Sequence, residues 1–139
     1  HVAHGVIRPG TRMELHARLK DIFESLTDLI RIHSPHEAAV EEAFMKNNPA
    51  SAIKLGHARA ACLLAASTTG LGIGEYSAKS VKKSVVGTGA ADKAQVAYMM
   101  NVLMPGCGVK AGDAADALDI AVCHAHRVNA AGVLYRRVG

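Results

Sequence analysis

Three aspartates stand at three-residue intervals near the end of the chain, in Asp113-Ala-Ala-Asp116-Ala-Leu-Asp119. At about 100° per residue they share one side of a helix, and no cation follows them until Arg127. Carboxylates so close together repel each other unless a cation or solvent intervenes. The other side of this helix is expected to be apolar, formed by Ala114, Ala117, Leu118, Ala121, Val122 and Ala125.

Two interpretations of these acids stay open on spacing alone. Acids in the first turn of a helix favour the helix dipole, which accounts for Asp113 and Asp116 without any ligand. The alternative is a divalent cation such as Mg²⁺, which takes one or two protein carboxylates and completes its shell with substrate phosphate.

A second acidic position lies far away in the sequence. Glu41 and Glu42 belong to residues 37–44, a run compatible with a strand, so their side chains are expected on opposite faces. One of them would then face inward and serve function while the other meets solvent. A lone strand glutamate is more often exposed than catalytic, so Glu41 predicts little without a partner.

Lysines gather around a glycine-containing break. Lys79, Lys82 and Lys83 precede Gly87-Thr88-Gly89, and Lys93 follows it. Exposed glycine N–H groups beside a helix start and lysines are typical of a phosphate cradle, although a solvated lysine face fits equally well. The P-loop pattern is absent, and Gly70-Leu-Gly-Ile-Gly74 precedes a strand, unlike a dinucleotide-binding loop.

Composition and charge narrow the class of protein. The 139 residues are 50% hydrophobic and 20% charged, which suits one globular domain, residues 1–139. The net charge of +4 favours an anionic partner. No apolar run is long enough for a membrane span.

The odd, widely spaced Cys62, Cys107 and Cys123 favour a reducing cytoplasm over a disulfide framework. Zinc at Cys123-His124-Ala-His126 is disfavoured, because the two histidines project about 200° apart on a helix.

The elements that must position these residues alternate between helix and strand. Apolar spacing predicts a first helix behind a capping box at Thr11-Arg12-Met13-Glu14, ended by His33-Ser34-Pro35. The further expectations are a weak strand in residues 1–7, strands at 37–44 and 72–76, an alanine-rich helix from Asn48-Pro49 to Gly70, and helices at 77–86, around 96–103 and from 113 to about 127, before a short basic tail. This alternation predicts an α/β layer architecture.

Taken together, the ordered motifs resemble the family of RuvC-type Holliday junction resolvases. The resemblance spans nearly the whole chain and is carried by residues 40–45 (VEEAFM), 51–56 (SAIKLG), Ala58-Arg59, Glu75-Tyr76, Val81-Lys82, 85–89 (VVGTG), 91–93 (ADK), Gln95-Val96, 113–118 (DAADAL) and 123–126 (CHAH). An ordered set of this kind is far more specific than any one motif, and it favours the metal interpretation of the acids.

The resemblance implies a fold and an activity. The fold would be RNase H-like, a mixed sheet with helices on both faces. The activity would be paired symmetric nicking of four-way DNA junctions by a cytoplasmic homodimer. Each subunit would use two Mg²⁺, with Mn²⁺ as a substitute. The partners would be RuvA/RuvB-type branch-migration proteins, and no membrane would be involved. Glu41, Asp113 and Asp116 match three of the family's four catalytic, metal-binding acids. DNA-binding roles would fall on Phe44, Lys82 and Lys93, and the alanine-rich helix after Asn48 matches the dimer helix.

One departure from the family pattern lies at the start of the chain. The family begins with two strands that carry a first catalytic aspartate in a D-P-G segment, and His1 falls where its third strand would begin. We therefore expect upstream residues in the natural protein. If that segment were truly missing, a catalytically silent junction-binding or dimerisation module would be favoured. A third hypothesis is an RNase H-like nuclease that acts on other branched or RNA-containing substrates.

Overall fold

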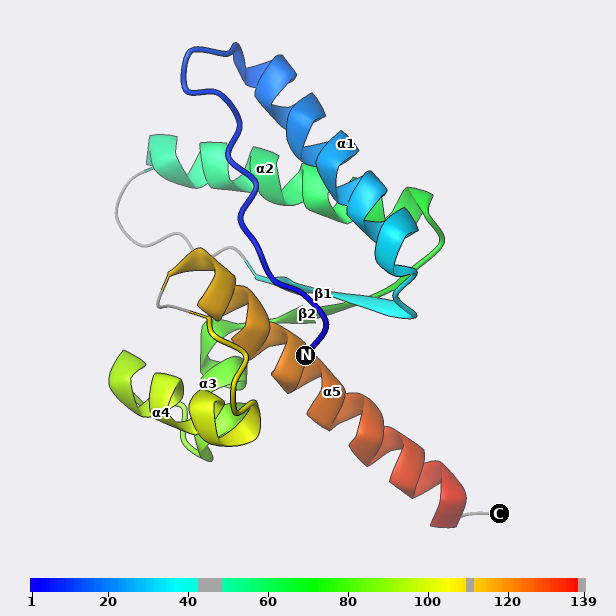
Figure 1. Ribbon diagram of the computed structural model, residues 1–139, viewed down its shortest axis with the longest axis vertical. Coiled ribbons are helices and arrows are strands. Elements are labelled where there is room, and N and C mark those ends of the chain that lie inside the picture. Colours follow the sequence, from blue (N-terminus) through cyan, green and yellow to red (C-terminus); the bar gives the residue numbers. More distant parts are fainter. Residues whose placement is uncertain (43–48, 110–111, 138–139) are drawn as a thin grey trace. The chain divides into compact units, whose positions relative to one another are not determined.

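The computed structural model describes residues 1–42, 49–109 and 112–137. Its elements are, in order, α1 (Leu15–His33), β1 (Glu37–Glu41), α2 (Pro49–Thr68), β2 (Gly72–Tyr76), α3 (Ala78–Val86), α4 (Lys93–Leu103) and α5 (Asp113–Arg137), as Figure 1 shows. The contacts divide the chain into a first unit, Ile7–Glu75, and a second unit, His1–Val6 with Tyr76–Gly139. A single domain over residues 1–139 stays a prediction.

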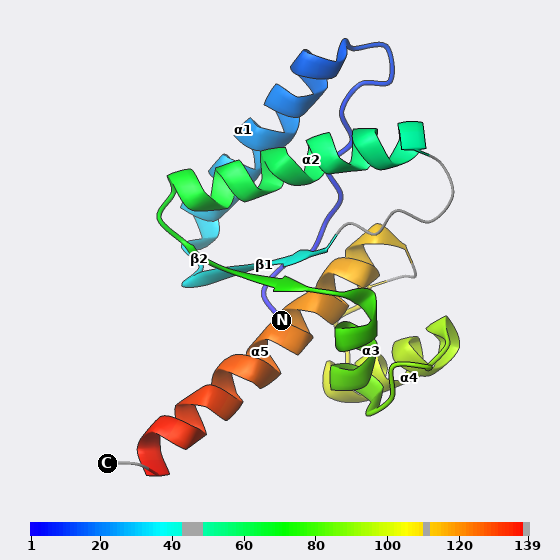
Figure 2. The ribbon, with the colours of Figure 1, turned by 180° about the vertical axis from the view of Figure 1, so that it is seen from behind.

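The first unit contains a β-α-β arrangement. β1 and β2 are hydrogen-bonded neighbours in a two-stranded sheet, and both views show them running in the same direction, with α2 as the connection (Figures 1 and 2). Parallel neighbours need such a crossover, which is usually a helix. α1 packs against α2, and α2 packs against β1. The predicted alternation of helix and strand is confirmed here.

The long amphipathic helix α1 ends as predicted but begins differently. Ser34 caps its C-terminus in the left-handed conformation, at φ 44°, and donates its N–H to the Ile30 carbonyl. The capping box at Thr11 is wrong, because the N-cap is Glu14 without a side-chain hydrogen bond. Thr11 instead lies inside a turn in which the Met13 N–H reaches the Gly10 carbonyl at 3.1 Å.

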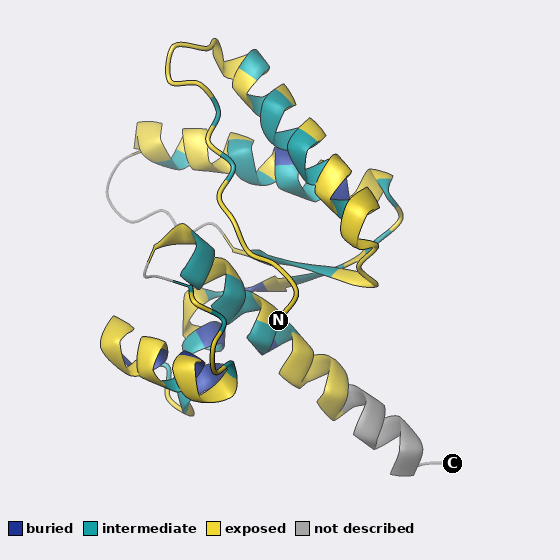
Figure 3. Cartoon of the chain, viewed as in Figure 1, coloured by how far each residue is buried: buried dark blue, intermediate teal, exposed yellow. Residues whose placement is uncertain are grey.

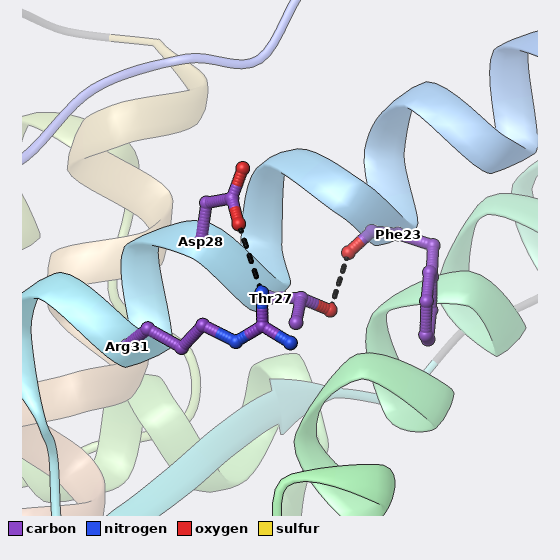
Figure 4. A network of polar contacts seen from close by, with 4 residues as sticks. All are labelled: Phe23, Thr27, Asp28 and Arg31. Atoms are coloured by element: carbon purple, nitrogen blue, oxygen red, sulfur yellow. Dashed lines mark hydrogen bonds and ion pairs between the residues drawn. The ribbon is translucent and has the colours of Figure 1, made fainter.

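Polar side chains of α1 bond within the helix. The Thr27 hydroxyl donates to the Phe23 carbonyl at 2.8 Å, and Arg31 pairs with Asp28 at 3.4 Å, as Figure 4 shows. Both are local contacts between neighbouring turns. They satisfy the polar side of α1 without tying it to another element.

The buried side of α2 consists of small residues. Its buried positions are Ala61, Ala65 and Ala66, and side chains this small let α1 approach closely. Its larger apolar residues Ile53, Leu55 and Leu64 are all exposed. Figure 3 shows exposed stretches of α2 beside buried ones. The predicted end at Gly70 is confirmed, since Gly70 has φ 80° and the Gly70 and Leu71 N–H groups bond to the Ser67 and Ala66 carbonyls. This is a Schellman arrangement, which glycine adopts without strain.

Residues 1–14 form neither helix nor strand, so the weak strand expected in residues 1–7 is wrong. A strand is stable only when a neighbour satisfies its N–H and C=O groups. In the described ranges, the two strands that are present pair with each other. Residues 1–7 form no strand pair with either of them.

The second unit is helical around a compact apolar core. α3 begins at Ser77, whose side chain accepts from the Ser80 N–H, and ends at Gly87 with φ 89°. α4 begins with a capping box between Asp92 and Gln95. Both α4 and α5 pack on α3, and the core consists of Tyr76, Val81, Val85, Ala91, Val96, Met100 and Cys123.

α5 is longer than predicted and continues to Arg137. The expected end near Arg127, followed by a tail, is therefore wrong. The residues after Arg127 include Val128-Asn-Ala-Ala and no proline, so no backbone clash stops the helix. Throughout the described ranges, no helix is long and apolar enough to cross a membrane.

Candidate active site

The acidic start of α5 presents two carboxylates to solvent. Asp113 and Asp116 lie in its first turn and are exposed. The Gly112 carbonyl accepts from the Ala115 and Asp116 N–H groups, which begins the helix at this point. Their position agrees with the helix-dipole interpretation, and it also leaves both carboxylates accessible to a cation.

Asp119 continues the same side of α5 but is half-buried. Burial, with a smaller contribution from the Asp116 carboxylate, raises the pKa of Asp119 to about 6, although the positive charge of Lys93 opposes this. Asp116 and Asp119 are therefore close enough to repel each other. A cation at Asp116 would relieve that repulsion.

Lys93, the first residue of α4, lies beside this acidic turn. Its Nζ is 3.9 Å from Asp116 Oδ2, and its side chain is 92% exposed. An exposed pair at this distance is weak and is screened by salt. The sequence assigned Lys93 and Asp116 to one site, and the structure brings these two together within the second unit.

The apolar side expected for α5 is only partly correct. Ala117, Ala121 and Ala125 are exposed, whereas Cys123 is fully buried. Exposing alanine to water costs little free energy, so the sequence of an alanine-rich helix does not predict which side is buried. The buried line that leads to Cys123 lies close to the side that carries Asp116 and Asp119.

The Cys-His segment of α5 makes contacts with Tyr76 and α3 of the same unit. The Cys123 thiol lies 3.9 Å from the Ser80 carbonyl. His124 Nδ1 is hydrogen-bonded to the Tyr76 hydroxyl at 2.7 Å, and His126 Nδ1 to the Ser84 hydroxyl at 3.2 Å. These contacts give the segment a packing role.

In the glycine-containing break after α3, some backbone N–H groups already donate hydrogen bonds within the protein. The Gly87 N–H caps α3 at the Lys83 carbonyl, and the Ala90 N–H donates to the Thr88 hydroxyl. A side chain at Gly89 would collide with the Lys79 stem, 2.7 Å from an added Cβ. Lys82 is half-buried on α3. A phosphate cradle here stays a prediction, and it would need other donors than these two N–H groups.

Glu41 ends β1 in the first unit, and its backbone is held by a residue of α2. Arg59 Nε donates to the Glu41 carbonyl at 2.8 Å, and Arg59 Nη2 pairs with the carboxylate of Glu75 on β2. Glu41 itself is exposed, as is Glu42, which follows the strand. Nearby, burial raises the pKa of the Cys62 thiol, with the Arg59 charge acting in the opposite direction.

The predicted site residues thus fall in two places. Asp113, Asp116, Lys82 and Lys93 belong to the second unit, Glu41 belongs to the first, and Phe44 lies outside the described residues. Within the described ranges, no group of three or more His, Cys, Asp and Glu side chains could hold a metal ion. Within the second unit, the structure brings Lys93 beside Asp116, on the turn that also carries Asp113.

A family model described as crossover junction endodeoxyribonuclease RuvC matches residues 1–124. The chain belongs to the RuvC family. It is 62% identical over 125 residues to the crossover junction endodeoxyribonuclease RuvC of Maricaulis maris, a match that covers 90% of this chain and 75% of that protein. The RuvC of Caulobacter vibrioides is 52% identical over 126 residues, covering 91% of this chain and 75% of that one.

Solved structures of a RuvC protein share the fold. The Thermus thermophilus RuvC structure matches with a TM-score of 0.79 at 29% identity and covers 91% of this chain and 77% of that one. T. thermophilus RuvC in complex with a Holliday junction substrate also matches with a TM-score of 0.79, at 30% identity, over 89% of this chain and 76% of that one. The predicted family and fold class are confirmed.

Sequence reasoning assigned no role to Arg59 or Glu75, although both stand in the RuvC-like motifs. The available signal was a charged residue in the middle of an alanine-rich helix. Such a charge must either reach solvent or find a partner. The partners of Arg59 lie 18 and 16 residues away in the sequence. The spacing of residues along one helix does not predict contacts with other elements.

Proposed function

We propose that this protein is a Holliday junction resolvase, an endodeoxyribonuclease that cuts four-way DNA junctions by paired symmetric nicks. The family match over residues 1–124 carries this proposal. It is supported by the similarity to a RuvC protein solved with a Holliday junction substrate and by the net charge of +4, which suits a polyanionic partner. The catalytically silent module is disfavoured, since the relatives at 62% and 52% identity are named as nucleases.

We propose Glu41, Asp113 and Asp116 as the catalytic, metal-binding acids, as the RuvC-like motifs imply. Asp113 and Asp116 are exposed on one turn of α5. Mg²⁺ is usually held by one or two protein carboxylates together with substrate phosphate, so this pair fits a site that DNA completes. Two Mg²⁺ per subunit are expected, with Mn²⁺ as a substitute. When bound, the divalent ions supply Lewis-acid stabilisation of the charge that develops on the phosphate.

The chain's own residues would orient the DNA for this reaction. A long, exposed ion pair holds Lys93 near Asp116, so an arriving phosphate can draw its ammonium away from the carboxylate. There it would offset negative charge at the scissile phosphate. Lys82 on α3 and Phe44 are proposed as further DNA contacts, on the resemblance alone.

The test is incubation of the full-length protein with a synthetic four-way junction and Mg²⁺, with linear duplex and RNA-containing branched substrates as competitors. We expect symmetric nicks in the junction that EDTA abolishes and that linear duplex does not inhibit. Binding without nicking would favour the silent module. Equal cutting of the competitors would favour the other RNase H-like nuclease.

We also propose a homodimer formed through α2. The support is that Ile53, Leu55 and Leu64 stay exposed on this helix while its alanines form the core, and that an open groove of about 370 Å³ lies beside Leu64, lined by Leu19, Lys20, Phe23, His57, Ala60, Ala61 and Leu64. Twofold symmetry would set two identical sites against two like strands. RuvA/RuvB-type partners are proposed on the resemblance alone. A cytoplasmic location is proposed also because Cys62, Cys107 and Cys123 are free thiols.

Sedimentation of Leu64→Glu tests the dimer. A charge in an apolar interface is left unpaired, so the dissociation constant of the dimer should rise at least about tenfold. Ile32→Glu on α1 is the matched control, because Ile32 is 72% exposed. An unchanged dimer in Leu64→Glu would contradict the role of α2.

A further inference from the structure

We infer that Arg59 is a positioning residue for Glu41: it fixes the end of β1 through the Glu41 carbonyl and is itself fixed by Glu75. This inference rests on the proposed function, in which Glu41 is a metal-binding acid. It assigns Arg59 no contact with DNA or metal. Its whole role would be to hold the backbone from which the Glu41 side chain projects.

The contacts of Arg59 join three elements of the first unit. From α2, its Nε donates to the carbonyl of Glu41, the last residue of β1, at 2.8 Å. Its Nη2 pairs with Glu75, which lies on β2. The guanidinium is planar and its donors point in fixed directions, so one side chain satisfies both partners at once.

Arg59 reaches the backbone of Glu41 and leaves the carboxylate to other partners. The charge of the guanidinium is balanced by Glu75 instead. Within the described ranges, the Glu41 carboxylate has no hydrogen bond or ion pair to the protein. An arginine that paired with Glu41 directly would compete with a cation, whereas this arrangement holds the residue without neutralising it.

Partial burial distinguishes this contact from the surface ion pairs of the same unit. The Arg59 side chain is 23% exposed and that of Glu75 48%. In Lys20–Glu24 every side chain is at least 60% exposed, and in Arg31–Asp28 at least 68%. A pair that is better shielded from water is also less screened by salt. Arg59 is therefore suited to fixing geometry.

The end of a strand is where such help is needed. Inside a ladder, neighbouring hydrogen bonds fix each peptide plane, but the ladder stops at Glu41. The orientation of the Glu41 carbonyl sets the ψ angle of that residue. By holding this carbonyl, Arg59 restricts the backbone at the position where the side chain must be aimed.

The test measures Mn²⁺ binding by electron paramagnetic resonance on the full-length protein, together with junction affinity in EDTA. In Arg59→Gln we expect Mn²⁺ affinity to fall on the order of tenfold, as is typical when a residue that orients a ligand is lost. Junction affinity should change less than about threefold, roughly the effect of one lost charge. Glu75→Gln keeps an acceptor for Arg59 and should retain Mn²⁺ affinity better than Arg59→Gln.

Arg31→Gln is the matched control, because Arg31 pairs only locally with Asp28 (Figure 4). Arg59→Lys is a second variant, chosen in case Arg59→Gln does not fold. It keeps the charge and the aliphatic stem but lacks the planar guanidinium that bonds both partners, so its Mn²⁺ affinity should also fall. Wild-type Mn²⁺ affinity in folded Arg59→Lys would overturn the inference. A wild-type protein that does not nick the junction would instead overturn the proposed function, so the two failures are distinguishable.

Discussion

The two units hold their acidic residues in different ways. Glu41 ends a strand, and a side chain from another element, Arg59, fixes its carbonyl. Asp113 and Asp116 begin a helix, whose backbone orients them by itself, and the exposed Lys93 forms an ion pair with Asp116. A strand loses its hydrogen-bond ladder at its end, whereas a helix orients its side chains from the first turn. The first arrangement thus depends on a distant residue and the second on local structure.

The units also differ in how they pack. The buried residues of α2 are alanines, which allow close approach to α1. The second unit buries larger side chains, among them Val81, Val85 and Met100. Helices packed through small residues leave no space for larger side chains, so substitutions that add volume should destabilise the first unit.

The largest effect is expected at the start of α5. Asp116→Asn should lower junction nicking on the order of 1000-fold, because a bound divalent ion contributes several kcal/mol to catalysis and about 1.4 kcal/mol is tenfold. Junction binding in EDTA should persist, since a negative charge is removed. Asp28→Asn, an exposed acid on α1, is the control. Nicking by Asp116→Asn within tenfold of wild type would contradict the role of this helix.

A middle effect is expected in the alanine core. Ala65 is 0% exposed, so Ala65→Leu forces extra volume between packed elements and should lower the free energy of unfolding by about 1–3 kcal/mol. Urea denaturation measures this. Ala97→Leu, at an exposed position of α4, should stay within about 0.5 kcal/mol. Equal stability of both variants would show that the α2 core tolerates added volume.

The smallest effect concerns Asp119 and pH. Its pKa of about 6 in the folded protein lies above the usual value of about 3.9 in an unfolded chain. The folded state therefore retains the proton more tightly, and stability falls as pH rises from about 4 to about 6. Asp119→Asn cannot ionise, so at pH 7.5 in EDTA it should be more stable than wild type by about 1 kcal/mol, after allowance for solvent screening.

Urea melts of both proteins across pH 4 to 7.5 check the sign. The advantage of Asp119→Asn should shrink as the pH falls. A constant difference over this range would mean that Asp119 titrates as an ordinary surface acid.

Local chemistry was the part of the fold that the sequence could predict. Ser77 begins α3, Gly70 and Gly87 follow helix ends, and β2 has the predicted bounds, because in each case neighbouring residues determine the conformation. Thr11 failed as a cap because a competing turn uses Gly10 and Met13. The capping box of Asp92 and Gln95 is also local chemistry, and it begins α4 at Lys93, before the helix expected around residues 96–103.

The candidate site was predictable only in part. Periodicity alone placed Asp113, Asp116 and Asp119 on one side of α5, but it did not reveal that Asp119 is half-buried, which depends on packing against other elements. Arg59 joins residues 18 and 16 positions away. Contacts between elements follow from the fold as a whole, and motif resemblance could point to these residues without giving their roles.

Our central proposal is that Glu41 and the aspartates of α5 are ligands of the same metal ions. Its most direct test is a Mn²⁺ titration, by electron paramagnetic resonance, of full-length wild type, Glu41→Gln and Asp116→Asn. Each substitution should weaken the same binding event by at least about tenfold, since each removes a carboxylate ligand. Wild-type Mn²⁺ binding by Glu41→Gln, alongside lost binding by Asp116→Asn, would contradict the claim and separate Glu41 from the site.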